Sequence, residues 1–339
     1  MRNGLEQGYA NGNLSGLMSG LGGGLQSSFV MTNRLNMLNP SSVTEPKLKP
    51  VFYINADNVA LTSGAVQIAY NQIRSTPGEL LTNTANNYGI FDQTAGTTYR
   101  PPLRVGGLNG KNFMDFSDTG NRYLSSYVTS TSLFASTSPS VTGTGMTFIF
   151  VIKREQGGTY TILDARDSST LSTTNDLLLE VNASGSITFT YCGGNSGSVT
   201  NFIGTAGVNL LNDWSILTVK CQLRKDGLAI PDDSSGSTIA KRYSFPIDSR
   251  IGSTAPLDVF VNGVEQDKKI TTNTWTNADW YNDGTFRMLD RDMWIGNKGS
   301  VFATSGTQIA AALMIPSYIS KAYQQRLENY FRWYYSLPF

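Results

Sequence analysis

Histidine is absent from this chain of 339 residues, and cysteine occurs only twice, as Cys192 and Cys221. Without imidazole the chain lacks the commonest general base and the commonest neutral metal ligand. Two cysteines this far apart are too few for a structural zinc site or for a disulfide-stabilised scaffold. Each cysteine lies in a strand-like run, so we expect buried free thiols rather than a bridge.

An excess of charge of one sign is also missing, since 26 lysines and arginines face 25 aspartates and glutamates. A net charge of +1 gives no general basic field for a nucleic-acid partner. No apolar run approaches the roughly 20 residues of a membrane-spanning helix. Glycine and asparagine interrupt the N-terminus before the apolar core of a signal peptide can form. We expect no nucleic acid, no membrane span and no export by a signal peptide.

Glycine, in contrast, is plentiful, with 34 copies among many Ser, Thr and Asn residues. Between these turn-forming residues lie short apolar runs of the length and pattern of β-strands. Asn262-Gly263 is the preferred dipeptide of a two-residue hairpin turn. The pattern predicts an all-β chain of two packed antiparallel sheets. The clearest strand candidates are 146–153, 159–165, 176–181, 186–192, 214–221, 257–264 and 308–315.

One helix is predicted at the C-terminal end, over 321–335, with Ser320 as its N-cap. Its apolar residues share one face, so the helix is expected to pack on the outside of the sandwich or over an edge. That face consists of Tyr323, Leu327, Tyr330, Phe331 and Tyr334. The polar residues Gln324, Arg326, Glu328 and Arg332 are expected off this face.

The N-terminal segment has glycine at every fourth position, at Gly4, Gly8, Gly12, Gly16, Gly20 and Gly24. Leucine follows four of these glycines directly, as Leu5, Leu17, Leu21 and Leu25. In a helix the glycines form a spiral ridge that is stable only against another backbone. In an extended ribbon they all face one side. A mobile leader is the third alternative, but the leucines recur in phase with the glycines, which favours an assembly arm.

The composition divides the chain into three parts. Residues 1–38 form the glycine-periodic arm, and 39–50 form a linker with three prolines, which favour extended backbone. Residues 51–339 form the sandwich.

A polar and aromatic segment at 271–286 is the leading candidate for a binding site. Aromatic faces stack on the C–H surfaces of sugars, and Asn and Asp bind hydroxyl groups, so the segment suits glycans. The same composition suits a subunit interface or a cover over the end of the sandwich. The candidate glycan-binding residues are Trp275, Asn277, Asp279, Trp280, Tyr281 and Asn282.

Carboxylate pairs offer weaker candidates. For hydrolysis the pairs are Asp176 with Glu180, and Asp290 with Asp292; even spacing on a strand is more typical of a solvated face. Calcium could be bound by Asp164 with Asp167, or by Asp115 with Asp118. The glycine-rich runs GLGGG and GGLNGK lack the features of phosphate loops and are interpreted as turns. We expect no metal or other cofactor, with calcium as the alternative.

Several blocks, in their order along the chain, resemble the concanavalin A-like, laminin-G-like jelly rolls of phage and other viral structural proteins and of bacterial surface proteins. These blocks are VFYINADNV (51–59), RPPLRVGGLNGKNFMDFSDTGNRYLSS (100–126), MTFIFVIK (146–153), DVFVNGV (258–264) and the C-terminal block 293–335. The resemblance implies the sandwich fold and, more weakly, a role as lectin, adhesin or spacer. The Glu-x-Asp-x-x-Glu run of glycoside hydrolases with this fold does not occur, so no enzyme is expected.

The arm, the linker and the resemblance together predict a virion structural protein, such as a capsid decoration, head fibre or tail-associated protein. Its expected location is the virion, and its partners are other virion proteins, copies of itself in a trimer, and host-surface glycans. The alternative is a carbohydrate-binding lectin or adhesin module on a virus or cell surface.

Overall fold

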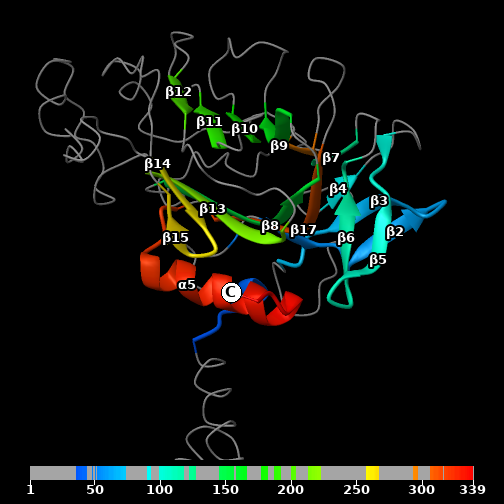
Figure 1. Cartoon of the computed structure of the whole chain (residues 1–339), viewed down its shortest axis with the longest axis horizontal. Coiled ribbons are helices and arrows are strands. Elements are labelled where there is room, and N and C mark those ends of the chain that lie inside the picture. The colour runs from blue at the N-terminus through cyan, green and yellow to red at the C-terminus, as the bar shows by residue number, and fades with distance from the viewer. Residues whose placement is uncertain are drawn as a thin grey trace, which may run out of the picture.

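The computed structural model describes the sandwich and a short segment before it. The described residues are 36–43, 48, 50, 52–73, 90–92, 99–117, 122–126, 145–155, 158–165, 177–181, 187–191, 200–203, 213–222, 257–266, 293–296, 306–315 and 317–338. Their strands form two antiparallel sheets, and a C-terminal helix lies on the outside of one of them (Figure 1). The predicted all-β jelly-roll sandwich with one C-terminal helix is therefore confirmed. The glycine-rich arm lies outside the described residues.

The sheet beneath the helix, called here the helix-side sheet, has eight strands. Along it lie β15 (Val264–Glu265), β14 (Leu257–Val261), β13 (Ser215–Gln222), β8 (Gly145–Arg154), β17 (Thr307–Ile315), β6 (Lys111–Asp115) and β5 (Leu103–Leu108). The first strand, β1 (Phe52–Asn55), also pairs with β17. The last strand of the sandwich thus lies in the middle of this sheet.

The second sheet, called here the outer sheet, has nine strands. In order these are β12 (Thr200–Ile203), β11 (Ile187–Tyr191), β10 (Leu177–Val181), β9 (Tyr160–Ala165), β16 (Met293–Gly296), β7 (Tyr123–Ser126), β4 (Ile90–Asp92), β3 (Ala65–Tyr70) and β2 (Val59–Thr62). Strand β16 pairs with β9 on one side and with β7 on the other. It therefore joins the strands β9–β12 to β7 and, beyond β7, to β4, β3 and β2.

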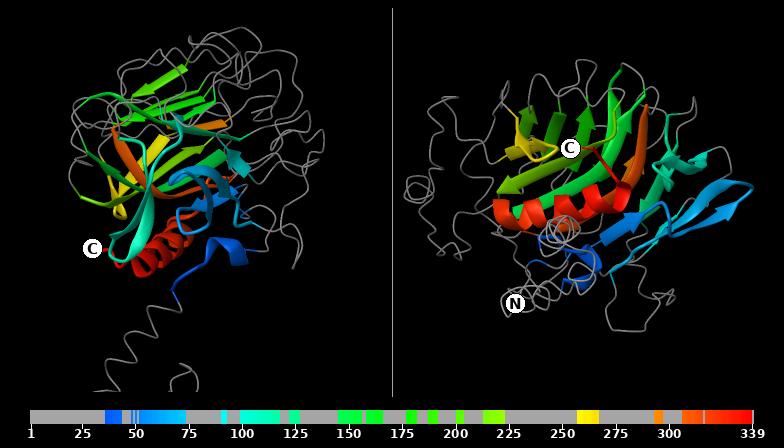
Figure 2. Two further views of the ribbon diagram at one scale, coloured as in Figure 1. Left: turned by 90° about the vertical axis from the view of Figure 1, so that its right-hand side faces the viewer. Right: turned by 60° about the horizontal axis from the view of Figure 1, so that its bottom comes forward.

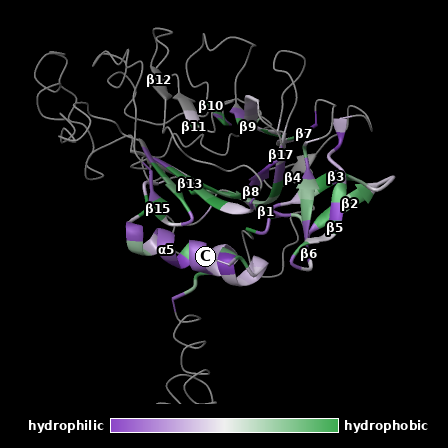
Figure 3. Ribbon diagram, viewed as in Figure 1, coloured by the Kyte–Doolittle hydropathy of each residue, from purple (hydrophilic) through white to green (hydrophobic). Residues whose placement is uncertain are grey.

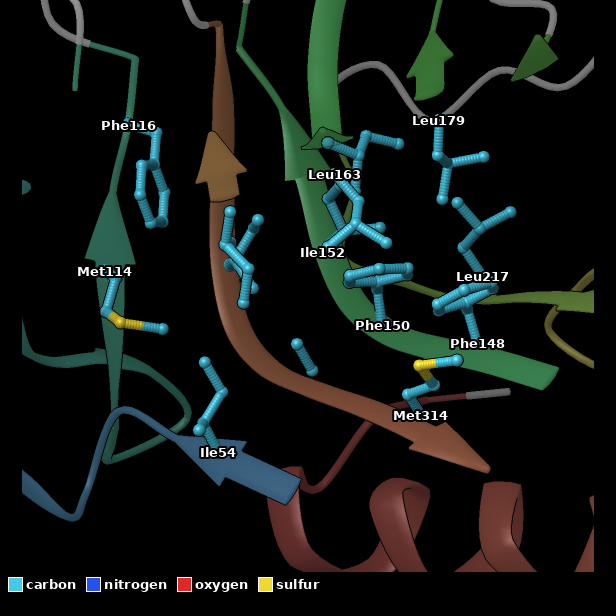
Figure 4. Packing of buried hydrophobic residues seen from close by; sticks show 14 of the residues in the cluster. Ile54, Met114, Phe116, Phe148, Phe150, Ile152, Leu163, Leu179, Leu217 and Met314 are labelled. Carbon is cyan, nitrogen blue, oxygen red and sulfur yellow. The ribbon is translucent and has the colours of Figure 1, made fainter. Parts of the chain in front are cut away.

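The central strands β8 and β17 of the helix-side sheet are buried on both faces because both sides of each strand are largely apolar. In β8, Phe148, Phe150 and Ile152 point into the core between the sheets (Figure 4), whereas Ile149 and Val151 belong to a second core beneath the helix. All nine residues of β17 are buried. Figure 3 shows this apolar composition along β8 and β13. A strand buried on both faces reads as a continuous apolar run rather than as an alternating one.

The predicted strands and turns are present. All seven strand candidates from the sequence correspond to strands of the sheets. Asn262 and Gly263 both have positive φ, at 56° and 81°, between β14 and β15. Asn109 and Gly110, in the run GGLNGK, form the same kind of turn between β5 and β6, with φ of 49° and 84°. That run is therefore a turn, as its sequence predicts.

The helix α5 (Lys321–Tyr335) covers the outer face of the helix-side sheet. At its start, the side chain of Ser320 accepts a hydrogen bond from the Tyr323 N–H at 3.2 Å, as expected for the N-cap. At its end, Ser336 adopts a left-handed conformation, and the Leu337 N–H donates to the Arg332 carbonyl at 2.9 Å. This pattern is a Schellman motif.

The expectation that Gln324 and Glu328 lie off the buried face is wrong, because both are 1% exposed. Oε1 of Glu328 accepts hydrogen bonds from Thr218 Oγ1 at 2.7 Å and from Gln324 Nε2 at 2.8 Å. The physical reason is the composition of β13, which presents Thr218 and Lys220 to the helix instead of apolar residues. Arg326 is exposed, as predicted.

Residues 36–43, called here the N-terminal strap, lie against helix α5. The Leu38 N–H donates to the Arg326 carbonyl at 3.0 Å, and Met37 and Leu38 pack on the core beneath the helix. The strap ends in a short 3-10 helix, Pro40–Ser42. Figures 1 and 2 place it on the far side of α5 from the outer sheet. The chain therefore enters the sandwich at the face opposite the outer sheet.

Candidate functional site

Aromatic side chains gather on the face of the outer sheet that is turned away from the core. Met293 and Ile295 of β16 point into the core, so Trp294 between them points outward. Leu124 of β7 is likewise a core residue, which places Tyr123 and Ser125 on the outward face. Alternation along the two paired strands thus brings the side chains of Trp294 and Tyr123 to one face.

Three aromatic rings form a continuous cluster there, called here the aromatic platform. The ring centroids of Tyr123 and Trp294 lie 4.6 Å apart at an interplanar angle of 53°. The Tyr99 ring lies 5.8 Å from that of Tyr123 at 36°. Tyr99 is 39% exposed, and the other two residues are half-buried. Tyr123 at the centre of the platform thus contacts both other rings, and Tyr99 forms its solvent-accessible rim.

Polar side chains neighbour Trp294 in the outer sheet. In the sheet register Trp294 pairs with Ser125 of β7 on one side and with Asp164 of β9 on the other. Asp164 is fully buried, so its carboxylate is not presented at the surface of the platform. Ser125 is half-buried and offers a hydroxyl group at the platform. The arrangement provides flat apolar surfaces with a hydroxyl group beside them.

The platform is joined to its surroundings through Arg122. Nη1 of Arg122 donates to the carbonyl of Arg100, the residue after Tyr99, at 2.8 Å. Gly296 has a φ of 86°, and a Cβ there would lie 2.5 Å from the Arg122 carbonyl oxygen. Strand β16 therefore approaches β7 closely at the end that carries the platform.

A buried polar cluster on the opposite face, beneath α5, is structural. Lys220 is 2% exposed, with Nζ 4.7 Å from the Phe260 ring centroid and 4.5 Å from that of Tyr318. The Tyr318 hydroxyl bonds to the Asp258 carboxylate. Burial raises the pKa of the Glu328 carboxyl, against the lowering effect of its bonds from Gln324 and Thr218. These groups hold the helix on the sheet and do not face a ligand.

Both predicted sites lie outside the described residues. These sites are the arm (Gly4, Gly8, Gly12, Gly16, Gly20, Gly24, Leu5, Leu17, Leu21 and Leu25) and the segment with Trp275, Asn277, Asp279, Trp280, Tyr281 and Asn282. The aromatic platform was not predicted. Its residues come from three segments, and in the sequence Tyr123 and Trp294 stand out only as members of the blocks 100–126 and 293–335 that carry the family resemblance. The alternation around Trp294 in MWIG was the available signal.

The two calcium candidates are only partly described. Asp115 is 3% exposed, and its Oδ2 pairs with Arg104 Nε at 2.8 Å. Its Oδ1 accepts a bond from the Ser117 N–H at 3.0 Å. Asp118 and Asp167 lie outside the described residues. Within the part of the chain that the structure describes, no three His, Cys, Asp or Glu residues are grouped as a metal site requires.

Of the carboxylates considered for hydrolysis, the structure describes only Glu180. It lies in β10, paired with Thr188 of β11, and is half-buried. Its proposed partner Asp176, and the pair Asp290 and Asp292, lie outside the described ranges.

Among the described helices none has the length and apolar character to cross a membrane.

No protein-family model matches the chain, and no curated protein matches it either. Solved structures with a similar β-rich fold include botulinum neurotoxin type C, whose cell entry is described as dependent on two ganglioside molecules; the identity is 11% and the TM-score 0.40. That match covers 71% of this chain and 48% of the toxin chain.

Two further structures show the same kind of distant similarity. The binding domain of botulinum neurotoxin serotype G matches at 8% identity and a TM-score of 0.37, over 84% of this chain and 51% of that one. A Trypanosoma rangeli sialidase matches at 12% identity and a TM-score of 0.40, over 93% of this chain and 40% of the sialidase. The chain thus spans about half or less of these three proteins. At this level of similarity, the function has to be inferred from the chain's own residues.

Proposed function

We propose that this chain is a carbohydrate-binding β-sandwich that binds glycans on the aromatic platform of its outer sheet. The observation that carries the proposal is the contact of Tyr99, Tyr123 and Trp294 on the outward face, with the hydroxyl of Ser125 beside them. The negative face of an aromatic ring attracts the C–H groups of a sugar ring, and the neighbouring hydroxyl can bond to the sugar hydroxyls.

The test is a glycan-array measurement, followed by titration, with three single variants. Tyr99→Ala and Trp294→Ala remove parts of the platform, and we expect each to weaken binding about tenfold or more, corresponding to about 1.4 kcal/mol. The matched control is Trp333→Ala, because Trp333 is 50% exposed on α5, on the opposite face. Tyr99→Ala is the variant least able to disturb the core, because Tyr99 lies at the accessible rim of the platform. Equal binding by all three variants would refute the proposal.

The segment 271–286 remains a second proposed site for the same function. The seven-residue step from Phe286 to Met293 limits the distance between these two residues to about 25 Å. This bound applies to the Phe286 end of the segment, which precedes the strand that carries Trp294. Trp275→Ala and Trp280→Ala belong in the same titration. Loss of binding in these two variants, with Tyr99→Ala unaffected, would move the site from the platform to this segment.

We also propose that residues 1–35 attach the sandwich to an assembly, with a trimer of this chain on a virion as the specific form. Two observations support attachment: the period of four in the glycines, and the strap that enters the sandwich at the face opposite the platform. An arm that leaves from the strap would direct the platform away from the particle.

The measurement for this second proposal is the mass in solution, by light scattering, of the full chain and of a chain that starts at Asn36. An oligomer that becomes a monomer on truncation supports an assembly arm. Equal masses would show that the arm does not associate with itself, and the trimer would then be ruled out as its role.

A further inference from the structure

Arg122 lies where the three segments of the aromatic platform meet. It directly precedes Tyr123, its Nη1 donates to the Arg100 carbonyl at 2.8 Å, and its own carbonyl faces Gly296 of β16. Its side chain is half-buried.

The segment that carries Tyr99 is held by three consecutive carbonyl groups. The Pro101 carbonyl accepts from the Val66 N–H at 2.8 Å, and the Pro102 carbonyl accepts from the Asp115 N–H at 2.9 Å. Both prolines have a fixed φ, which stiffens the chain after Arg100. The Arg100 carbonyl is the acceptor nearest to Tyr99, and a side chain rather than a backbone N–H bonds to it.

We propose that Arg122 is the positioning residue of the glycan platform, because its guanidinium group holds the Tyr99 segment so that the Tyr99 ring lies beside Tyr123. The ligand in this proposal rests on the function proposed above, whereas the positioning of Tyr99 does not. A planar guanidinium group is preorganised to donate to the carbonyl in a fixed direction, whereas a lysine ammonium group on its flexible side chain would hold the carbonyl less firmly. Arg122 thus acts on the ligand through Tyr99 and is not itself a contact residue.

The proposal predicts that the effects of Arg122 and Tyr99 overlap. Without this hydrogen bond the Tyr99 segment is free to move in the unbound protein, and the entropy cost of fixing it is paid when the glycan binds. Arg122→Met should therefore weaken glycan binding by about twofold to tenfold. In the double variant with Tyr99→Ala, the loss should equal that of Tyr99→Ala alone, since the residue that Arg122 positions is gone. Additive losses would show that Arg122 acts independently of Tyr99 and would overturn the proposal.

The matched control is Arg332→Met. Arg332 also donates to a backbone carbonyl, that of Asn262 at 2.6 Å, but at α5 on the opposite face. We expect this variant to lower stability while leaving glycan affinity unchanged. Arg122→Lys keeps the charge and the length of the side chain, so it serves if Arg122→Met does not fold. Native affinity in a folded Arg122→Lys chain would show that the guanidinium geometry is dispensable and would overturn the proposal.

A readout without any glycan separates this inference from the proposed function. With 3-fluorotyrosine at position 99 of the full chain, the fluorine NMR signal reports the surroundings of that ring. We expect Arg122→Met to shift the signal toward that of a solvent-exposed tyrosine, and Arg332→Met to leave it in place. An unchanged signal in Arg122→Met would refute the positioning role even if glycans bind, and a shifted signal would support it even if none does.

Discussion

At the scale of single residues, glycines show where the backbone has no room for a side chain. Gly296 and Gly64 both have positive φ, at 86° and 77°. A Cβ at Gly64 would meet nothing within 4 Å, whereas one at Gly296 would lie 2.5 Å from a backbone oxygen and 2.7 Å from the Phe116 ring. A side chain at Gly64 therefore has only the conformational cost of positive φ, whereas a side chain at Gly296 has a steric cost in addition.

Gly64→Ala should destabilise the chain by roughly 1–2 kcal/mol, the cost of a left-handed alanine. Gly296→Ala adds a clash with rigid backbone and should cost roughly 3 kcal/mol or more. Urea unfolding of both variants checks the difference. Equal losses would mean that strand β16 can move away from β7 without cost.

Glu328 makes the stability of the fold depend on pH. Burial raises its pKa in the folded chain above the unfolded value of about 4.3, so the folded chain binds this proton more tightly. The contribution of this group to stability is therefore fully present at low pH and is lost as the pH rises through the folded pKa. Glu328→Gln removes this titration while it keeps an acceptor for Thr218 and Gln324.

We expect Glu328→Gln to lose less stability than the native chain as the pH rises above about 4, and to be at least as stable at pH 8. Thermal unfolding at several pH values measures this. The control is Glu265→Gln, on the exposed strand β15. Parallel stability curves for the native chain and Glu328→Gln would contradict the expectation.

At the scale of the elements, helix α5 is fixed at both ends by short sequence signals. Ser320→Ala removes the N-cap acceptor and should cost about 1 kcal/mol. Ser336 has a φ of 50° at the C-cap, so Ser336→Gly should stabilise the chain by up to about 1 kcal/mol. Melting temperatures of the two variants should move in opposite directions. A decrease in both would show that the Ser336 side chain stabilises the fold.

The elements were largely predictable from the sequence, and the candidate site was not. Local patterns define the strands, the Asn262-Gly263 turn and the capped helix, because each depends on neighbouring residues. The burial of Glu328 depends on Thr218, which is distant in sequence and faces the helix only through the sheet register. The platform has the same origin, since Tyr99, Tyr123 and Trp294 meet only after β7 and β16 pair.

At the scale of the whole molecule, the strap is part of the packed structure. Met37 and Leu38 of the strap, and Leu48 after it, pack against the core beneath α5, and the side-chain amide of Asn329 donates to the Asn36 carbonyl at 3.5 Å. The predicted division into an arm (1–38), a linker (39–50) and a sandwich (51–339) stays a prediction. These contacts, however, join residues of the arm and of the linker to the sandwich.

A chain that starts at Val51 loses these contacts, and a chain that starts at Asn36 keeps them. We expect the shorter chain to be less stable by on the order of 2–3 kcal/mol, from the apolar surface of three partly buried side chains. Urea midpoints of the two chains provide the comparison. The same midpoint for both would mean that the strap adds nothing to the stability of the sandwich.

The pairing of β1 with β17 also sets the order of events during synthesis. Phe52 lies opposite Met314, so the first strand of the sandwich finds its neighbour only after β17 has been made. Strand β17 is also the link between β8 and β6 in the helix-side sheet. Contacts of such high sequence separation form slowly. A nascent chain halted before residue 307 would lack the middle of that sheet, so the sandwich should close only after its last strand has left the ribosome.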